Sequence, residues 1–512
     1  MRRCVAVAIL LLACGPKHAP RTPAGIAGLL AYVPADAPFV VASLEPWTLD
    51  DVRQWKEMYG PVFREAMHTK TDSQGMRILA AIDEELGDNV TEQRIAELGF
   101  SPRPHAVFYP LGSKLVVLRL ELRDARTALQ TLDRIAKRAG QPLGPAQRVA
   151  GFPVYRAKNG TAFVFADDQL VVVLGDRPVV DRGLGSTLQR PARAFDERTL
   201  RDLIARHHLD PHLAAMLDTA QLVRMAAQDA GLSPSGACAS ELAAFTGLVP
   251  RVVGSLSSTR KRQGMRVVAE LAPALRAELA ATKVPLPAQA EAFATHRIAT
   301  FALGVDLERG QRVLRGIAET MQRAGTACGW QKLREGAEGM TRAIGEPIPP
   351  QIAQLRGGVA SLLAYAPSGW GALPARIEGF AVLYGTLPHE LVDVAQKAGV
   401  PADGQLHPLN LAALGLPGLP RVIGMVGERI AAIAIGDRGE QLLPRALAAK
   451  SDAPAPLFRM RVDYGRFLEI TKRSEGQDRA VAAAMAKIYG DTDWVLDVTD
   501  EGLVTEVGWN VK

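Results

Sequence analysis

The segment Val171-Val172-Val173-Leu174-Gly175-Asp176-Arg177 recurs later in the chain as Ala432-Ile433-Ala434-Ile435-Gly436-Asp437-Arg438. Each copy is an apolar run followed by Gly-Asp-Arg, a pattern typical of a buried strand that ends in a turn. Two further pairs of segments keep the same order and nearly the same separation: Ala136–Gly140 with Ala395–Gly399, and Phe39–Glu45 with Ala299–Asp306. Because three ordered matches at one separation do not readily arise by chance, the sequence predicts an internal duplication.

The duplication predicts two homologous units in the 512-residue chain, at residues 33–272 and 296–512. Residues 273–295 between them contain several Pro and Ala and little periodicity, which indicates a linker. The predicted order in each unit is strand, helix, hairpin, helix, three-strand meander, helix and hairpin.

Local patterns support this order. Residues 49–67 and their counterpart 307–324 carry apolar side chains at helical spacing, whereas Leu170–Leu174 is apolar throughout and of strand length. Asn159-Gly160 between two short apolar runs is typical of a tight hairpin turn. The predicted fold class is therefore α+β, with two tandem homologous units of mostly antiparallel sheet and helices packed on one face.

The N-terminus has the features of a signal peptide over residues 1–13. An Arg pair precedes the apolar run Val5–Leu12, which is too short to cross a bilayer. The run ends in Leu11-Leu12-Ala13-Cys14-Gly15, which resembles the lipobox of bacterial lipoproteins. The resemblance implies cleavage before Cys14 and acylation of this residue, so that residues 14–32, rich in Pro and Gly, become a flexible tether.

An acylated Cys14 implies a lipid-anchored protein of the bacterial cell envelope, whose membrane partner is reached through the acyl chains. Gly15 stands where inner-membrane retention signals typically place Asp, which favours the outer membrane. The alternative is an ordinary secretory signal with an incidental Cys.

Two of the four cysteines remain once Cys4 is removed with the signal peptide and Cys14 is lipidated. Outside the cytoplasm, oxidising conditions favour a disulfide between Cys238 and Cys328. It would tie a helix late in the first unit to one early in the second. The alternative is two separate buried thiols. A metal site at these cysteines is not expected, because the sequence has no Cys-x-x-Cys motif and no His pair near them.

The segment Tyr32-Val33-Pro34-Ala35-Asp36-Ala37-Pro38-Phe39-Val40-Val41 resembles the opening of an uncharacterised family of bacterial exported proteins, the domain-of-unknown-function 3352 family. Its members begin with a tyrosine-aliphatic-proline-alanine-aspartate segment that leads into a strand. Here Ala37 replaces the commoner Thr. The resemblance implies an exported protein and brings no activity, cofactor or catalytic residue with it.

Composition excludes several classes of function. Apolar residues are 48% and charged residues 22%, which is ordinary for a globular protein and excludes disorder. The net charge of +6 is spread over the chain. The cluster Arg260-Lys261-Arg262 lies on a predicted hairpin tip whose counterpart is Asp500-Glu501, so both are interpreted as solvated turns. No nucleic-acid partner is expected.

Candidate chemical groups are few. His207, His208 and His212 lie near Asp210, but Asp210-Pro211 resembles a helix start, which spoils the spacing for a shared metal. Asp83-Glu84-Glu85 is interpreted as a solvated helix face, because three consecutive side chains cannot face one pocket. The sequence therefore predicts no catalytic residue, no cofactor and no metal ligand.

Three functional hypotheses follow. The first is a non-enzymatic envelope scaffold or binding module with an envelope protein as its partner. The second is a carrier or sensor of a hydrophobic ligand such as lipid, held between sheet and helices. The third is a hydrolase with a non-local site. A dry apolar pocket would favour the carrier, a flat apolar patch the scaffold, and a cleft with converging carboxylates or His the enzyme.

Overall fold

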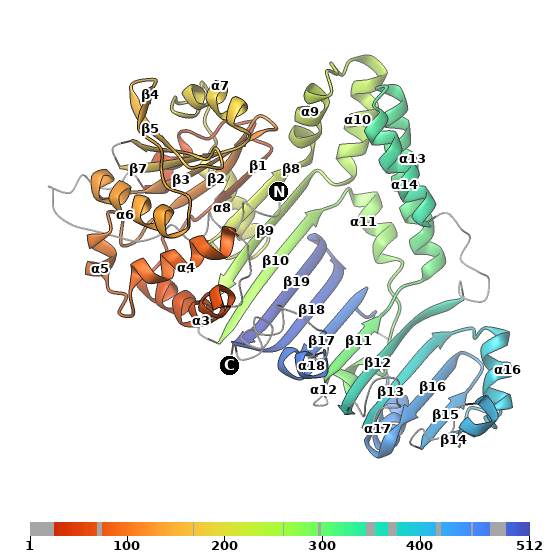
Figure 1. The fold of residues 1–512 in the computed structure, drawn as a ribbon. Helices are drawn as coiled ribbons and strands as arrows, with labels where there is room; N and C mark the ends of the chain where they lie inside the picture. The colour runs from red at the N-terminus through yellow and green to blue at the C-terminus, as the bar shows by residue number, and fades with distance from the viewer. Residues whose placement is uncertain are drawn as a thin grey trace. The chain divides into compact units, whose positions relative to one another are not determined.

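The computed structural model describes residues 25–511 except 69–73, 167, 260, 295–297, 345–353, 367–375, 416–420, 452–453 and 472–487. The chain divides into two compact units (Figure 1). In the described part of the chain, the first holds residues up to Ser233 together with Pro250–Val267. The second holds Pro234–Val249, Val268–Glu475 and Ala486–Lys512. The fold class is α+β, as predicted.

The first unit is an antiparallel sheet in which neighbouring strands follow the order β9–β8–β1–β2–β3–β7–β6–β5–β4. Its strands are β1 (Phe39–Ala42), β2 (Ala106–Leu111), β3 (Leu115–Glu121), β4 (Gln147–Val149), β5 (Phe152–Arg156), β6 (Ala162–Ala166), β7 (Gln169–Leu174), β8 (Ala214–Asp218) and β9 (Arg251–Ser258). β10 (Arg262–Glu270) follows β9 in a hairpin. The helices of the first unit are α2 (Gly25–Leu30), α3 (Leu49–His68), α4 (Gln74–Leu86), α5 (Glu92–Glu97), α6 (Ala125–Arg138), α7 (Arg177–Thr187), α8 (Glu197–Arg206) and α9 (Thr219–Asp229).

The second unit has the sheet order β19–β18–β17–β11–β12–β13–β16–β15–β14. Its strands are β11 (Ala299–Leu303), β12 (Leu355–Ala366), β13 (Arg376–Gly385), β14 (His407–Pro408), β15 (Val422–Val426), β16 (Ile430–Ile435), β17 (Phe458–Asp463), β18 (Tyr489–Thr499) and β19 (Gly502–Val511). Its helices are α10 (Gly236–Leu248), α11 (Pro273–Ala280), α12 (Gln289–Ala294), α13 (Leu307–Ala327), α14 (Gln331–Ile344), α16 (His389–Lys397), η1 (Leu411–Leu414), α17 (Gly436–Ala448) and α18 (Tyr464–Thr471). The strands from β9 to β5 in the first unit therefore follow one another across the sheet in the same order as the strands from β18 to β14 in the second. In this comparison β1 corresponds to β11, and β7 corresponds to β16.

Local sequence explains the elements. The Asp124 side chain accepts a hydrogen bond from the Thr127 N–H and starts α6, which ends before Gly140 with φ +71°. The turn between β5 and β6 contains Gly160 at φ +91°, a conformation that an L side chain rarely adopts. Gly439 brings α17 against β13, because an added Cβ would lie 2.2 Å from the Gly379 carbonyl oxygen.

Helices cover both faces of the first unit's sheet, whereas the sequence predicted one. One face packs against α3, α4, α5 and α6 in a core that includes Val52, Ile82, Leu132 and Val172. α2 and α7 contact β3, and α7 also contacts β7. β7 is apolar at consecutive positions, so each of its faces must be removed from water.

Two predicted connecting segments are folded instead. Gly25–Leu30, predicted as part of the tether, is a helix in which Leu29 and Leu30 are buried. The predicted linker 273–295 forms α11 and α12, and Phe293 of α12 belongs to the core of the second unit. Both predictions were wrong because helices of 6 or 8 residues have about two turns or fewer, which leaves little periodicity in the sequence.

The prediction of a solvated acidic face was wrong for two of its three residues. The Asp83 and Glu85 side chains are each 5% exposed. Lys56 on α3 approaches Asp83 at 2.7 Å. Two arginines of α6, Arg134 and Arg138, approach Glu85 at 3.0 and 2.9 Å. The carboxylates are buried because cations on neighbouring helices compensate their lost hydration.

Glu85→Gln is expected to lower the free energy of unfolding of the first unit by about 2 kcal/mol, since it removes the negative charge beside two guanidinium groups and replaces one acceptor oxygen by an NH2 donor. The value is below that of a fully buried pair because both arginines are nearly half exposed. Urea unfolding with hydrogen exchange in α4 and α6 measures it. The control is Glu84→Gln, whose side chain is 64% exposed. Equal losses in both variants would contradict the assignment.

Candidate functional site

The site residues predicted from the sequence fall in two places. Cys14, with the signal peptide before it, lies outside the described residues. Cys238 and Cys328 form the predicted disulfide. It joins α10 to the residue after α13, and both helices belong to the second compact unit, so the expectation that it bridges two units was wrong. Sequence order assigned α10 to the first repeat, but α10 packs against α13.

The histidine cluster does not start a helix. Asp210-Pro211 precedes β8, and the Asp210 carboxylate accepts a hydrogen bond from the His212 N–H and lies 3.0 Å from its Nδ1. His207 is buried after the last residue of α8. Among the described residues, no group of three His, Cys, Asp or Glu side chains could hold a metal ion.

An uncharged apolar face crosses the sheet of the second unit. Directly paired residues of antiparallel strands point to the same face. The register from β18 to β16 places six such residues in a first row: Trp494, Met460, Phe301, Ala360, Ala381 and Ile433. The neighbouring second row, in the same strand order, is Leu496, Phe458, Leu303, Gly358, Leu383 and Ala431. We call these twelve residues the apolar face.

The apolar face is open to solvent at several large side chains. Phe301 is 42% exposed, Leu303 45%, Ile433 44% and Trp494 39%. An antiparallel sheet ordinarily carries polar residues on its solvated face. Large exposed apolar patches mark sites that bind another molecule.

The charged residues of β17 and β18 lie on the opposite face. Arg459 lies over the ring of Phe293 in α12, and Arg461 donates to the Phe293 carbonyl oxygen. Both arginines bond to Asp493. Burial raises the pKa of Asp493, but the hydrogen bonds from Arg461 and Arg459 outweigh it and hold this pKa below its ordinary value. The charges are thereby paired beneath α12, away from the apolar face.

A pocket of about 280 Å³ lies at one end of the apolar face, beneath α16. Its sheet side is formed by residues of β13, β15 and β16: Ala381, Leu383, Gly424, Val426, Ala431 and Ile433. Its other side comes from α16 and the segment after it: Leu391, Val394, Ala395, Ala398 and Val400. Every residue named here is apolar, so the pocket offers a ligand hydrocarbon contacts and no side-chain charge.

Small residues create this pocket. The repeated segments align Val172 with Ile433. In the first unit, the row through Val172 contains Phe108, Leu118 and Phe163. At the same strand positions the second unit has Ala360, Ala381 and Gly424. The repeated segments also make α16 the counterpart of α6. α16 has no buried residue, whereas α6 buries Leu132 and Ile135. Smaller side chains on both sides leave a space that the first unit fills.

The helix pairs after the first strands also differ. In the first unit α3 and α4 contribute to the core over the face that contains Val172. In the second unit α13 and α14 pack on each other, α13 packs on α10, and neither helix contributes to the unit's core (Figure 1). Among the residues that the structure describes, α13 and α14 therefore do not give the apolar face the helical cover that α3 and α4 give its counterpart.

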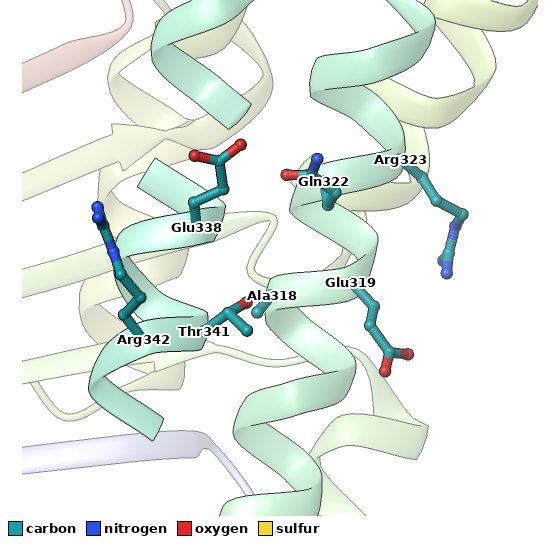
Figure 2. A pocket seen from close by; sticks show the side chains of 7 residues that line it. All are labelled: Ala318, Glu319, Gln322, Arg323, Glu338, Thr341 and Arg342. Carbon is teal, nitrogen blue, oxygen red and sulfur yellow. The ribbon is translucent and has the colours of Figure 1, made fainter. Parts of the chain in front are cut away.

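A second hollow, of about 640 Å³, lies between α13 and α14 (Figure 2). Figure 2 shows Glu338 and Gln322 facing the gap between the helices, whereas Glu319 and Arg323 point away on the far side of α13. Arg323 is 3.4 Å from Glu241 of α10. The acidic side chains that line the hollow do not converge on one point, so they do not form an acid-base pair.

The sequence analysis considered a cavity between sheet and helices as one alternative, but it identified none of the residues that line this pocket. Its available signal was the replacement of large apolar residues in the first repeat by Ala and Gly in the second. That signal becomes visible only when the strand register aligns residues far apart in the chain.

No family model matches this chain, and no curated protein is similar to it. Two crystal structures of TP0453, crystal forms I and III, each match with a TM-score of 0.26 and 10% sequence identity. The matches cover 48% and 50% of this chain and 78% and 81% of the other. At this TM-score the likeness does not establish a common fold. In the described part of the chain, no helix is long and apolar enough to span a membrane.

Proposed function

We propose that this protein is a non-enzymatic carrier or sensor of a hydrophobic ligand, held in the bacterial cell envelope by an acylated Cys14. The observation that supports the ligand class is the pocket beneath α16, because every residue that lines it is apolar. Pockets of this kind bind by removing apolar surface from water. The lipobox-like sequence around Cys14 and the exported-family resemblance at Tyr32–Val41 support the envelope location.

The ligand that fits best is an acyl chain. A flexible chain can follow an irregular hydrocarbon pocket and needs no hydrogen-bond partner inside it. A polar metabolite would leave its own polar groups unpaired there, at a cost of several kcal/mol.

Filling the pocket tests the proposal. Ala395 lines the pocket from α16, and Ala395→Phe adds a ring to it. We expect the mature chain with Cys14→Ser to bind a dansyl-labelled undecanoic acid, and Ala395→Phe to weaken this binding about tenfold or more, the cost of two or three unburied methylenes.

Gln396→Phe is the matched control. Gln396 neighbours Ala395 on α16 but is exposed and does not line the pocket, so binding should stay within about twofold. Fluorescence titration measures both affinities, and circular dichroism verifies folding. Absence of binding by the unsubstituted chain, or equal binding by Ala395→Phe, would overturn the proposal.

A further inference from the structure

We infer that the ligand is a membrane lipid whose acyl chains extend out of the pocket along the apolar face of the second unit. This inference rests on the proposed function and adds the length and class of the ligand. An acyl chain that enters beneath α16 would continue over a second subsite, which is formed by β12, β11, β17 and β18.

The first step is continuity. Ala381, Leu383, Ala431 and Ile433 belong both to the pocket and to the apolar face. The two rows then continue across β12 and β11 without interruption by a charged side chain. A chain that leaves the pocket therefore remains on hydrocarbon surface.

The second step is size. The pocket of about 280 Å³ is at the lower end of the range for ligand sites, about 300–1,000 Å³. The face from β16 to β18 covers five strand spacings, or about 24 Å. One extended acyl chain covers about 15 Å, half the hydrocarbon thickness of a bilayer. The face is therefore longer than one extended acyl chain, so a chain that fills the pocket has room to continue along it.

The third step is the shape of the face next to the pocket. Ala381 on β13 pairs directly with Ala360 on β12, and Ala360 pairs with Phe301 on β11. Small side chains therefore lead from the pocket onto the face as far as the ring of Phe301, which a chain that leaves the pocket would contact.

The fourth step is the charge. A protein interface ordinarily surrounds its apolar centre with polar groups that form hydrogen bonds. The twelve residues of the apolar face include none with a polar side chain except the indole N–H of Trp494. An acyl chain has no hydrogen-bonding group along its length, so it can lie on these twelve residues without leaving a polar group of its own unpaired.

The test separates the pocket from the face with two probes. The short probe is the dansyl-labelled undecanoic acid, and the long probe is a pyrene-labelled dipalmitoyl phosphatidylglycerol offered in phosphatidylcholine vesicles. The protein is the mature chain with Cys14→Ser. The variant carries Phe301→Lys and Leu303→Lys, which place two charges on exposed positions outside the pocket.

We expect the double variant to extract the phospholipid at least tenfold more weakly than the parent and to bind the short probe within twofold. Phe301→Ser with Leu303→Ser should weaken extraction in the same direction without added charge, which guards against a folding defect caused by lysine. Leu314→Lys is the matched control, because Leu314 on α13 is 43% exposed and is not one of the twelve residues of the apolar face.

The outcomes are distinguishable. If neither probe binds the parent chain, the proposed function fails. If Ala395→Phe abolishes binding of the short probe while the face variants extract phospholipid as well as the parent, the function stands and this inference is overturned. If the face variants lose a stoichiometric envelope protein in native mass spectrometry and retain phospholipid, the face is a protein docking surface and the inference is overturned.

Discussion

Arg119→Ala should lower the free energy of unfolding of the first unit by about 4 kcal/mol. The Arg119 side chain is 1% exposed and is the largest fully buried side chain among the described residues. Its Nε donates to the Tyr109 hydroxyl at 3.1 Å, and its Nη1 donates to Gln169 at 2.8 Å. Its Nη2 donates to the Thr187 carbonyl, and its guanidinium carbon lies 3.9 Å from the centre of the Tyr32 ring.

The magnitude is the lower end of two summed losses, because removal of the buried guanidinium also removes its own cost of desolvation. Truncation leaves a cavity inside a packed region, and large-to-small substitutions there cost about 2–5 kcal/mol. It also leaves the Gln169 side chain and the Thr187 carbonyl oxygen without this donor, at about 1–3 kcal/mol for each buried group that stays unsatisfied. Burial already raises the pKa of Tyr109, with Arg119 opposing the shift, so we expect this pKa to rise further in the variant.

Urea unfolding with hydrogen exchange in β2, β3 and β7 measures the effect. Arg123→Ala is the control, since Arg123 is exposed two residues beyond the end of β3 and should change stability by less than about 0.5 kcal/mol. The loss of unfolding free energy in Arg119→Lys should lie between the losses in Arg119→Ala and Arg123→Ala. Lysine keeps the positive charge but lacks the planar fork of donors. A loss below about 1 kcal/mol for Arg119→Ala would contradict the assignment.

Replacement of both Cys238 and Cys328 by Ala should lower the free energy of unfolding of the second unit by about 4.5 kcal/mol. The disulfide closes a loop with a sequence separation of 90. In the chain-entropy model, a crosslink of this length stabilises mainly by restricting the unfolded chain. The native contacts between α10 and α13, including the Arg323–Glu241 pair, remain in the variant.

Hydrogen exchange in α10 and α13 reports this change, and reduction of the parent protein provides an independent comparison. We expect the reduced parent and the double variant to lose the same stability. An unchanged urea midpoint in the second unit would refute the prediction, as would a loss confined to the first unit.

Much of the architecture followed from local patterns. The repeated segments at Val171–Arg177 and Ala432–Arg438 both form a strand that leads into a helix, as β7 into α7 and β16 into α17. Residues 49–67 and 307–324 form α3 and α13. These predictions were correct because periodicity of apolar residues and turn residues acts over a few neighbours in the chain.

The candidate site did not follow from those patterns. Periodicity shows that a strand has apolar positions, but it does not show which helix covers them. α3 and α13 occupy the same position in the repeat and are both amphipathic, yet only α3 contributes to a core over the sheet. The buried Glu85 is a similar case, because its arginine partners come from a helix about 50 residues away in the sequence.

The sequence by itself predicted the duplication, the α+β class and the pairing of Cys238 with Cys328, because each is expressed in residue types at short spacing or in their direct repetition. The tertiary structure alone decided that α13 and α14 pack with α10, that Ala360 and Ala381 align with Phe301 and Ile433, and that a hydrocarbon pocket opens beneath α16. Those features depend on contacts between residues distant in the chain. The free energy of packing and of strand register selects such contacts, and no local pattern encodes them.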